Sequence, residues 1–564
     1  MRTVYFNKVR VLVTSFLLFH LFTLSPLSAQ PSWVKKATKS VFTLKTFSAD
    51  GSLLASSNGF FTGTNGEAVS SYTPFKGASR AIIIDAQGKE AAVLSILGAN
   101  DIYDVVRFRV DISKSQPLPI CHTTMSEGSL AWLLPYHETK QIPSGPIRKA
   151  ELFMQDYAYY TLALASPQHT ESCPLLNEEG EVIALLQPSA NTQDSLSYAI
   201  SAVFADSLRI SGLSITDPIL QLTNIRKELP DNLKEANVAL YMASTRNDTL
   251  AYAEMVEEMI RKFPDAPDGY TYRAQQSAAR GDYAAADQDM QKAIKVSDAK
   301  DEAHFDLARM IYSKEVYLPE PPYENWSLDK ALSEIRNAIS INPLPTYRQL
   351  EGNILFAQKQ YPEAYDVFMS LTDTPLRDAE LFFSAAKCKA MMRDTTAMIS
   401  LLDSCVNTFS KPYLKEAAPY LWSRATARRE AGKYRDAISD MNEYEKLMSA
   451  NINDSFYYIR HQTDIQARLY QQALNDIDEA IRINPKETLY YAEKASLQVR
   501  VGLFDEAEAT AKECISIEPD NSDGYLFLGL AQCMKGEKQL GLDNLKKAKE
   551  LGDPQADALI EKFQ

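Results

Sequence analysis

Histidine and cysteine side chains, which can ligate a soft metal ion, occur as two close pairs in the first third of the sequence. Cys121 stands next to His122, and His169 precedes Cys173 by four positions. Both residue types are common zinc ligands, but structural zinc sites repeat short Cys or His spacings that neither pair shows. The sequence therefore predicts no metal site, and nothing in it indicates a cofactor.

The segment that contains His169 suggests a different chemistry, that of covalent peptide hydrolysis. It reads H-T-E-S-C-P-L-L-N (169 to 177) and follows three other motifs: S-V-F-T-L-K-T-F (40 to 47), N-G-F-F-T-G-T-N-G-E-A-V-S-S-Y-T-P-F (58 to 75) and G-A-N-D-I-Y-D-V-V-R-F-R-V (98 to 110). Together with A-W-L-L-P-Y (131 to 136) and L-S-Y-A-I-S-A (196 to 202), these motifs resemble trypsin-like serine proteases of the HtrA type. The resemblance implies an all-β double barrel over residues 33 to 210.

The resemblance also shows which catalytic residues have been replaced. Alignment on P-L-L-N puts Glu171 at the nucleophilic serine and Thr73 at the histidine, and only the triad acid, Asp104, is retained. The triad requires a base within hydrogen-bond reach of the nucleophile. Thr73 cannot act as that base, and the carboxylate of Glu171 would repel the negative charge that develops in the transition state. We therefore expect a catalytically degenerate domain.

Two further replacements affect the turn that forms the oxyanion hole in this family. His169 and Ser172 stand where the family has glycines, so each adds a Cβ where the backbone needs a positive φ. Since the oxyanion hole is usually the largest electrostatic contribution to catalysis, its loss reinforces the expectation of inactivity. The simplest explanation of the retained residues is that P-L-L-N-E-E-G-E-V-I forms a β-hairpin needed for folding.

The first 29 residues have the features of a signal peptide. Arg2, Lys8 and Arg10 precede an apolar run over residues 11 to 24, and L-S-A precedes Gln30. This pattern predicts export with cleavage after Ala29. The location that we favour is the periplasm, and the alternatives are the cell surface and secretion. No later segment is apolar over a length that could span a bilayer.

The chain is acidic and poor in cysteine. Its 564 residues carry a formal charge of −14, which becomes −17 when the three basic residues of the signal segment are removed. Such a charge argues against nucleic acid and anionic membranes as partners. Six cysteines are few for an exported chain of this length. Cys388 with Cys405, and Cys514 with Cys533, have spacings suited either to disulfides or to packing between antiparallel helices, and we favour packing.

From about residue 230 the pattern changes to paired helices that repeat about every 34 residues. Gly502 and Gly536 lie 34 positions apart, as do Pro485 and Pro519. The same turn recurs as A-R-G-D-Y-A-A-A (279 to 286), Q-K-Q-Y-P-E-A (358 to 364), A-G-K-Y-R-D-A (431 to 437), A-R-L-Y-Q-Q-A (467 to 473) and V-G-L-F-D-E-A-E-A (501 to 509). These copies resemble tetratricopeptide repeats. We count about nine over residues 233 to 564, of which the first and fifth are degenerate.

Side chains at fixed places in each repeat have predictable roles. Small residues such as Gly352 and Gly529 should let paired helices approach closely, and an aromatic residue should open each second helix: Tyr283, Tyr361, Tyr434, Tyr470 and Phe504. The third repeat carries an insertion that includes Y-L-P-E-P-P-Y-E-N-W (317 to 326). This insertion is either a ligand contact or a packed surface flap, and we favour the flap.

A stack of such repeats exposes a concave face lined by the first helix of each repeat, and this face binds proteins or peptides. Tyrosine and arginine are common binding hot spots. The candidates on the first helices are Tyr270, Arg273, Arg348, Arg424, Arg428, Tyr457, Arg460, Tyr491 and Lys494. The resulting local positive charge suits acidic or C-terminal carboxylate ligands.

The sequence thus predicts a signal peptide (1 to 29), a protease-like all-β double barrel (33 to 210), a linker helix (211 to 232) and an all-α repeat superhelix (233 to 564). The function we expect is that of an exported, non-catalytic, protein-binding scaffold. The alternatives are an active protease whose repeats recruit substrates, and a structural assembly factor of an envelope complex. The sequence does not indicate an oligomeric state.

Overall fold

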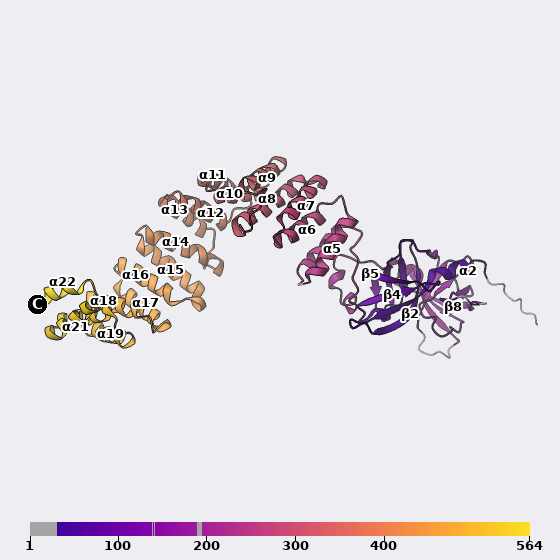
Figure 1. The fold of residues 1–564 in the computed structure, drawn as a ribbon, viewed down its shortest axis with the longest axis horizontal. Coiled ribbons are helices and arrows are strands. Elements are labelled where there is room, and N and C mark those ends of the chain that lie inside the picture. The colour runs from indigo at the N-terminus through magenta and orange to yellow at the C-terminus, as the bar shows by residue number, and fades with distance from the viewer. Residues whose placement is uncertain (1–30, 138, 140, 189–194, 247) are drawn as a thin grey trace, which may run out of the picture. The chain divides into compact units, whose positions relative to one another are not determined.

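The computed structural model describes residues 31–137, 139, 141–188, 195–246 and 248–564, so the predicted signal segment lies outside the described residues. The chain divides into two compact units, one ending at Gln276 and the other beginning at Ser277 (Figure 1). The first unit contains the strands and the first helices, and the second contains helices only. Each unit is described by itself.

The first unit begins with a short helix, α2 (Val34–Ala37), and a closed barrel of six antiparallel strands. The strands are β1 (Val41–Phe47), β2 (Leu53–Phe61), β3 (Glu67–Ser70), β4 (Arg80–Ile84), β5 (Glu90–Asn100) and β6 (Val105–Val110). Their order around the barrel is β1-β2-β3-β6-β5-β4. Alternate residues point inward, as strand geometry requires, and Phe42, Phe61 and Phe108 fill the interior.

A second closed barrel of six antiparallel strands follows. Its strands are β7 (Leu130–Leu133), β8 (Ser144–Phe153), β9 (Tyr157–Leu162), β10 (Pro174–Leu176), β11 (Val182–Leu186) and β12 (Ser197–Ser201), and α3 (Ala202–Ser207) ends the domain. The order is β10-β11-β12-β9-β8-β7. The hairpin of β10 and β11 is the P-L-L-N-E-E-G-E-V-I segment. The predicted trypsin-like double barrel is confirmed.

Residues 211 to 232, which we predicted to form a linker helix, are not α-helical. They form two short 3-10 helices, Ser214–Thr216 and Leu220–Leu222, followed by an extended stretch. In that stretch Ile96 of β5 donates its N–H to the Arg226 carbonyl (2.7 Å) and accepts from the Glu228 N–H (3.0 Å). The segment therefore bonds to the edge of the first barrel and cannot use the same backbone groups in a helix.

This segment leads into α4 (Leu233–Ser244) and α5 (Thr249–Lys262), which lie in the same unit as the barrels. The Glu228 carboxylate links the segment after the barrels to the first barrel and to α5. It accepts from Arg109 Nε on β6 (2.6 Å) and Ser95 Oγ on β5 (2.9 Å), and Lys262 Nζ of α5 lies 3.5 Å away. Although burial alone would raise it, these bonds hold the pKa of Glu228 below its ordinary value.

The boundary between the units falls within the next helix, α6 (Asp268–Ala279), and α7 (Tyr283–Val296) follows it. After these, seven consecutive pairs of helices pack together in the described part of the second unit: α8 (Lys300–Tyr317) with α9 (Leu328–Ile341), α10 (Pro345–Ala357) with α11 (Tyr361–Leu371), α12 (Ala379–Met391) with α13 (Thr395–Val406), α14 (Ala418–Glu430) with α15 (Tyr434–Met448), α16 (Asp454–Gln466) with α17 (Tyr470–Ile483), α18 (Thr488–Arg500) with α19 (Phe504–Ile517), and α20 (Ser522–Lys535) with α21 (Lys538–Glu550). A last helix, α22 (Ala556–Phe563), packs on α21. The five predicted aromatic residues are each the first residue of a second helix.

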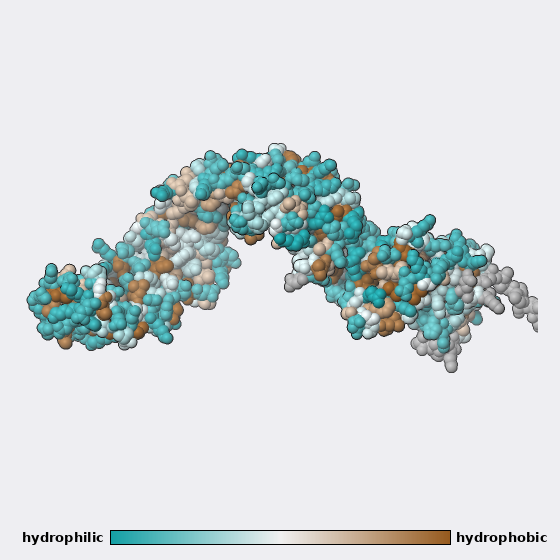
Figure 2. Space-filling model, viewed as in Figure 1, coloured by the Kyte–Doolittle hydropathy of each residue, from teal (hydrophilic) through white to brown (hydrophobic). Residues whose placement is uncertain are grey.

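The packing inside the pairs follows the predicted use of small residues. A Cβ on Gly352 would lie 2.7 Å from the Phe368 ring, and one on Gly529 would lie 2.7 Å from the Gly541 carbonyl oxygen. All six cysteines are free and buried, and the four in the helices, Cys388, Cys405, Cys514 and Cys533, are packed as thiols and form no disulfides. On the face drawn in Figure 2, hydrophilic residues dominate the helices and apolar ones are scattered among them.

The insertion in the third repeat is a packed flap. Trp326 is buried, and its ring lies 5.5 Å from that of Tyr283 at the start of α7. Tyr323 contacts the Trp326 ring edge-on and donates a hydrogen bond to Asp287 of α7 (3.4 Å). Residues 318–322, which precede these two anchors, are exposed.

Candidate functional site

Two of the residues that we predicted at triad positions, Thr73 and Asp104, are in contact. Thr73 opens a short 3-10 helix after β3, and its backbone N–H donates to Asp104 Oδ1 (2.6 Å). Asp104 lies in the turn before β6, with φ of 51°. The acid is therefore positioned beside the base position, but Thr73 offers it no imidazole to orient.

Ser172, the hydroxyl nearest to the lost nucleophile, is fully buried between the barrels. Its Oγ lies 2.7 Å from Ser71 Oγ and 3.1 Å from Ser57 Oγ, and it accepts from the Ser71 N–H (3.2 Å). Within the described residues no histidine is bonded to it. Since a serine nucleophile needs a base and access to a substrate carbonyl, this hydroxyl is structural.

The turn that carries Glu171 is held by a side chain of the first barrel. Asn58 of β2 donates through Nδ2 to the His169 carbonyl (2.8 Å) and to the Glu171 carbonyl (3.1 Å). His169 and Ser172 have φ of 64° and 66°, so the left-handed backbone that glycine would give is kept despite the added Cβ atoms. The replacements therefore change what fills the turn and not its backbone conformation.

The three residues predicted at triad positions differ in exposure. Glu171 and Thr73 are exposed and Asp104 is half-buried. No cluster of metal ligands occurs among the described residues, and neither of the two Cys and His pairs belongs to one.

Among the helices, several of the predicted binding residues form hydrogen bonds or ion pairs within their own repeat. Arg424 of α14 and Arg460 of α16 are buried. Arg424 forms two hydrogen bonds with Asp440 of α15 (3.0 and 2.7 Å), and Arg460 forms two with Asp476 of α17 (2.8 Å each). Each arginine thus joins the two helices of its repeat, which corrects our assignment of both to an exposed concave face.

Most of the other predicted residues are also engaged. Arg428 pairs with Asp403 and Asp440 (2.7 Å each), and Lys494 pairs with Asp478 (2.6 Å). Tyr270 and Tyr491 donate their hydroxyls to the backbone carbonyls of Pro264 and Pro485, respectively. Arg273 pairs with Glu257, and Tyr457 donates to the Glu445 carboxylate. Arg348 alone among the nine is classed as exposed.

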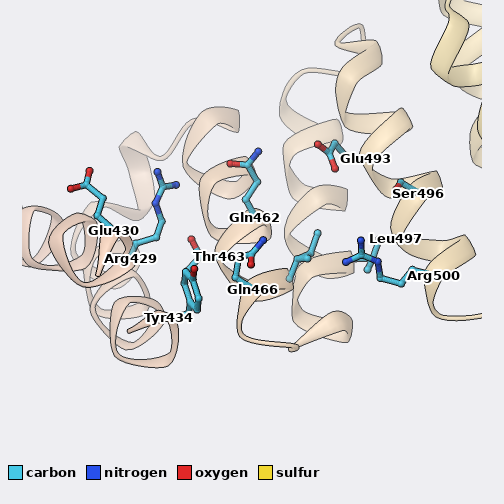
Figure 3. Close-up of a pocket in the computed structure, with 11 residues that line it drawn as sticks. Arg429, Glu430, Tyr434, Gln462, Thr463, Gln466, Glu493, Ser496, Leu497 and Arg500 are labelled. Carbon is cyan, nitrogen blue, oxygen red and sulfur yellow. The ribbon is translucent and has the colours of Figure 1, made fainter. Parts of the chain in front are cut away.

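A groove lies on another face of the same first helices. A cavity of about 670 Å³ runs across α14, α16 and α18, with Gln462 and Gln466 of α16 between Arg429 of α14 and Arg500 of α18 (Figure 3). Neither of these two guanidinium groups forms an ion pair with a side chain in the described part of the chain. The remaining lining residues are Glu430, Tyr434, Thr463, Ile465, Glu493, Ser496 and Leu497.

The sequence prediction missed this groove because of helical phase. Arg424 and the groove residue Arg429 are five positions apart on α14, which places their side chains about 140° apart around the helix axis. The repeat period contains the information: Glu430, Gln466 and Arg500 occupy equivalent places, since they lie 36 and then 34 positions apart. Choosing tyrosine and arginine by type alone selected the face that packs on the second helix.

A buried acid pair lies on the inner side of α16. Asp464 is buried, and its burial beside the Asp476 carboxylate raises the pKa of Asp464 to about 7. Asp464 Oδ1 has no hydrogen-bond partner in the described structure. His461, also buried, shares a hydrogen bond through Nδ1 with the Ala473 carbonyl (2.8 Å), and burial lowers its pKa. Helix α16, which lines the middle of the groove, therefore carries two buried titratable side chains, Asp464 and His461.

Comparison with known proteins supports a tetratricopeptide-repeat assignment for the helices. No family model matches the chain. It is 31% identical over 96 residues to small glutamine-rich tetratricopeptide repeat-containing protein 2 of Saccharomyces cerevisiae, covering 17% of this chain and 28% of that protein. It is 24% identical over 170 residues to the Hsp70-Hsp90 organizing protein of Triticum aestivum, covering 28% and 26%. The chain thus spans little more than a quarter of the length of these curated relatives.

Solved structures of serine proteases are similar to part of the chain. The Rv3671c protease from M. tuberculosis, in its active form, has 15% sequence identity and a TM-score of 0.29, covering 33% of this chain and 85% of that one. The serine endoprotease from Yersinia pestis has 18% identity and a TM-score of 0.27, covering 31% and 62%. The double barrel itself rests on the strand order described above.

Proposed function

We propose that this chain is an exported, non-catalytic scaffold whose helical repeats bind other proteins. The observation that carries the proposal is the groove across α14, α16 and α18, where two arginines without ion pairs flank two glutamine amides. An extended peptide presents both N–H and C=O groups, and a glutamine amide can donate to one and accept from the other. Repeat stacks use such concave surfaces for binding.

The barrels support the non-catalytic part of the proposal. Thr73 and Glu171 stand at the base and nucleophile positions, and the neighbouring Ser172 hydroxyl is buried in a cluster with Ser57 and Ser71. The first helix pair is bonded to the first barrel through Glu228 and Lys262. On this proposal the barrels serve as a folded support for the first repeat.

Site-specific cross-linking tests the binding site. The full chain carries a photoreactive phenylalanine analogue either in place of Gln466 in the groove or in place of Gln471 on α17, a second exposed glutamine outside it. Irradiation in native envelope extracts should yield adducts with other proteins from the first position only. Equal adducts from both positions, or none from Gln466, would contradict a protein-binding groove.

A further inference from the structure

Two backbone N–H groups of the loop after β3 bond to the residues around the predicted triad positions. Ser71 donates to Ser172 Oγ of the second barrel (3.2 Å), and Thr73 donates to Asp104 Oδ1 (2.6 Å). Tyr72 stands between these two residues, and its side chain is fully buried. Because adjacent residues share rigid peptide planes, a movement of Tyr72 changes the bonds on both of its sides.

The Tyr72 side chain reaches the segment that leads from the barrels to the first repeat. Its hydroxyl donates a hydrogen bond to the Ile219 carbonyl. Farther along the same loop, the Gly77 N–H donates to the Leu222 carbonyl (2.7 Å). We call residues 217–229 the strap, because they cross the first barrel and bond to the loop that carries the predicted base position.

The strap is also packed into the core of the first barrel. Leu220 and Ile225 are buried in the same apolar cluster as Tyr72 and Phe75 of the loop. Lifting the strap would expose apolar side chains of both segments to water, which is unfavourable. Segments that share buried contacts in this way tend to open together as one cooperative unit.

The far end of the strap is held by α5. The Glu258 carboxylate of α5 is buried, and it accepts from the Arg226 side chain and from the Leu229 N–H (3.0 Å). Hydrogen bonds to a charged group are stronger than those between neutral groups. Helix α5 therefore contributes directly to keeping the strap on the barrel.

We propose that the strap couples the first repeat to the predicted triad positions, so that a change at α5 which weakens its hold on the strap also loosens the bonds of Ser71 and Thr73. This inference goes beyond the proposed function, in which the barrels only support the first repeat. Coupling of this kind is reciprocal, so a change in the loop must also loosen the strap where it meets α5.

Hydrogen exchange of the full chain, resolved to single amides by mass spectrometry, tests this coupling. Glu258→Gln keeps the shape of the side chain but removes the charge that Arg226 faces, and it should speed exchange at the Ser71 and Thr73 amides roughly tenfold. The bonding partners of these two amides lie in the barrels, so their exchange reports transmission through the strap. The matched control is Glu257→Gln, at the exposed neighbouring position, which should leave both amides unchanged.

The reverse direction is tested from the loop. Tyr72→Phe keeps the buried ring and removes only the hydroxyl, and it should speed exchange of the Leu229 amide, which bonds to Glu258 of α5. Tyr159→Phe removes a hydroxyl that donates to Gln187 in the second barrel (2.9 Å), and it should leave the Leu229 amide unchanged. If Glu258→Gln does not fold, this second pair of variants decides the question.

Unchanged exchange at Ser71 and Thr73 in Glu258→Gln, or at Leu229 in Tyr72→Phe, would overturn the coupling. Equal acceleration in the two control variants would do the same, because it would show that any substitution has this effect. Acceleration that extends to the amides of β9 in the second barrel would mean that the whole first unit is destabilised, which also contradicts a specific route through the strap.

Discussion

The Asp104 carboxylate accepts a hydrogen bond from the Thr73 backbone N–H at 2.6 Å, as a triad acid does beside its histidine position, but the side chain there is a hydroxyl. Asp104 is present, but no histidine stands at position 73 for it to orient. At the nucleophile position, Asn58 bonds the carbonyls on both sides of the turn that ends in Glu171. Both sets of hydrogen bonds hold the backbone at the positions that we predicted for the base and the nucleophile.

We expect the chain to hydrolyse no casein and to leave fluorophosphonate probes unreacted. Restoring the two side chains with Thr73→His and Glu171→Ser should still give little activity, because the Ser172 Cβ and hydroxyl occupy the turn where the family has glycine. The matched control is the same pair combined with Ser172→Gly. Activity in the parent chain that disappears on Ser172→Ala would show that Ser172 is the nucleophile.

The contact between the barrels should matter for stability. Asn58→Ala removes both hydrogen bonds to the carbonyls of His169 and Glu171, and leaves these acceptors in a part-buried interface. We expect a loss of about 1–3 kcal/mol in the free energy of unfolding of the first unit. Calorimetry of the full chain should show the unfolding transition of the first unit at a lower temperature and that of the helical unit unchanged.

The buried arginines should act on stability and not selectively on binding. Arg460→Met leaves Asp476 without its two hydrogen bonds in a buried place, at a cost of about 3–5 kcal/mol. Arg348→Gln, at an exposed position, should change stability by less than about 0.5 kcal/mol. Urea unfolding followed by circular dichroism measures both. Equal stability of the two variants would restore Arg460 to the list of candidate ligand contacts.

The stability of the repeat that contains α16 and α17 should fall as pH rises from about 4 to about 7. The folded pKa of Asp464 is about 7, above the unfolded value of about 3.9, so the folded chain holds this proton more tightly over that window. Arg460 and Asp476 face the same carboxyl. His461 acts in the opposite sense below about pH 6.5, since burial keeps its ring neutral.

The variant Asp464→Asn isolates the acid because it leaves His461 in place. We expect it to be more stable than the parent chain at pH 8 by up to about 4 kcal/mol, with the difference shrinking toward pH 4. Denaturant unfolding at several pH values measures this difference. A difference that does not vary with pH would mean that Asp464 stays ionised, with its partner, throughout the range.

How much the sequence could predict depended on whether a residue's role is local. Tyr434 and Tyr470 begin second helices as predicted, because an aromatic residue fixed in a repeated turn has one place to pack. The two barrels were predicted through the resemblance to trypsin-like proteases, since pairs such as β1 with β4 and β3 with β6 join strands that are not consecutive in the chain. The ligand face did not follow, because residue type says nothing about helical phase, and Arg424 and Arg460 are bonded to acids 16 positions away.

Two further differences have the same origin in contacts between distant segments. The stretch from 211 to 232 contains both polar and apolar residues. The end of this stretch is extended because Arg226 and Glu228 form backbone hydrogen bonds with Ile96 of β5. The insertion at 317 to 326 has loop composition, yet Trp326 is buried against Tyr283. Deleting this insertion should therefore lower the melting temperature, contrary to what an exposed loop would predict.

The position of the Glu228 network predicts where the chain can be divided. A fragment of residues 31 to 276 keeps Glu228 bonded to Arg109 and close to Lys262, whereas one ending at residue 232 loses α5 and with it Lys262. The shorter fragment should also expose Leu229, which is buried against α4 and α5. We expect the longer fragment to unfold cooperatively at a higher temperature. Glu228→Gln, which keeps the shape but removes the charge, should lower the melting temperature of both fragments, because Arg109 faces Glu228 in each, and by more in the longer one, where Lys262 also faces it. If the two fragments melt alike and respond alike to this substitution, the first helix pair belongs with the repeats alone, and the boundary predicted from the sequence at residue 233 is the correct one.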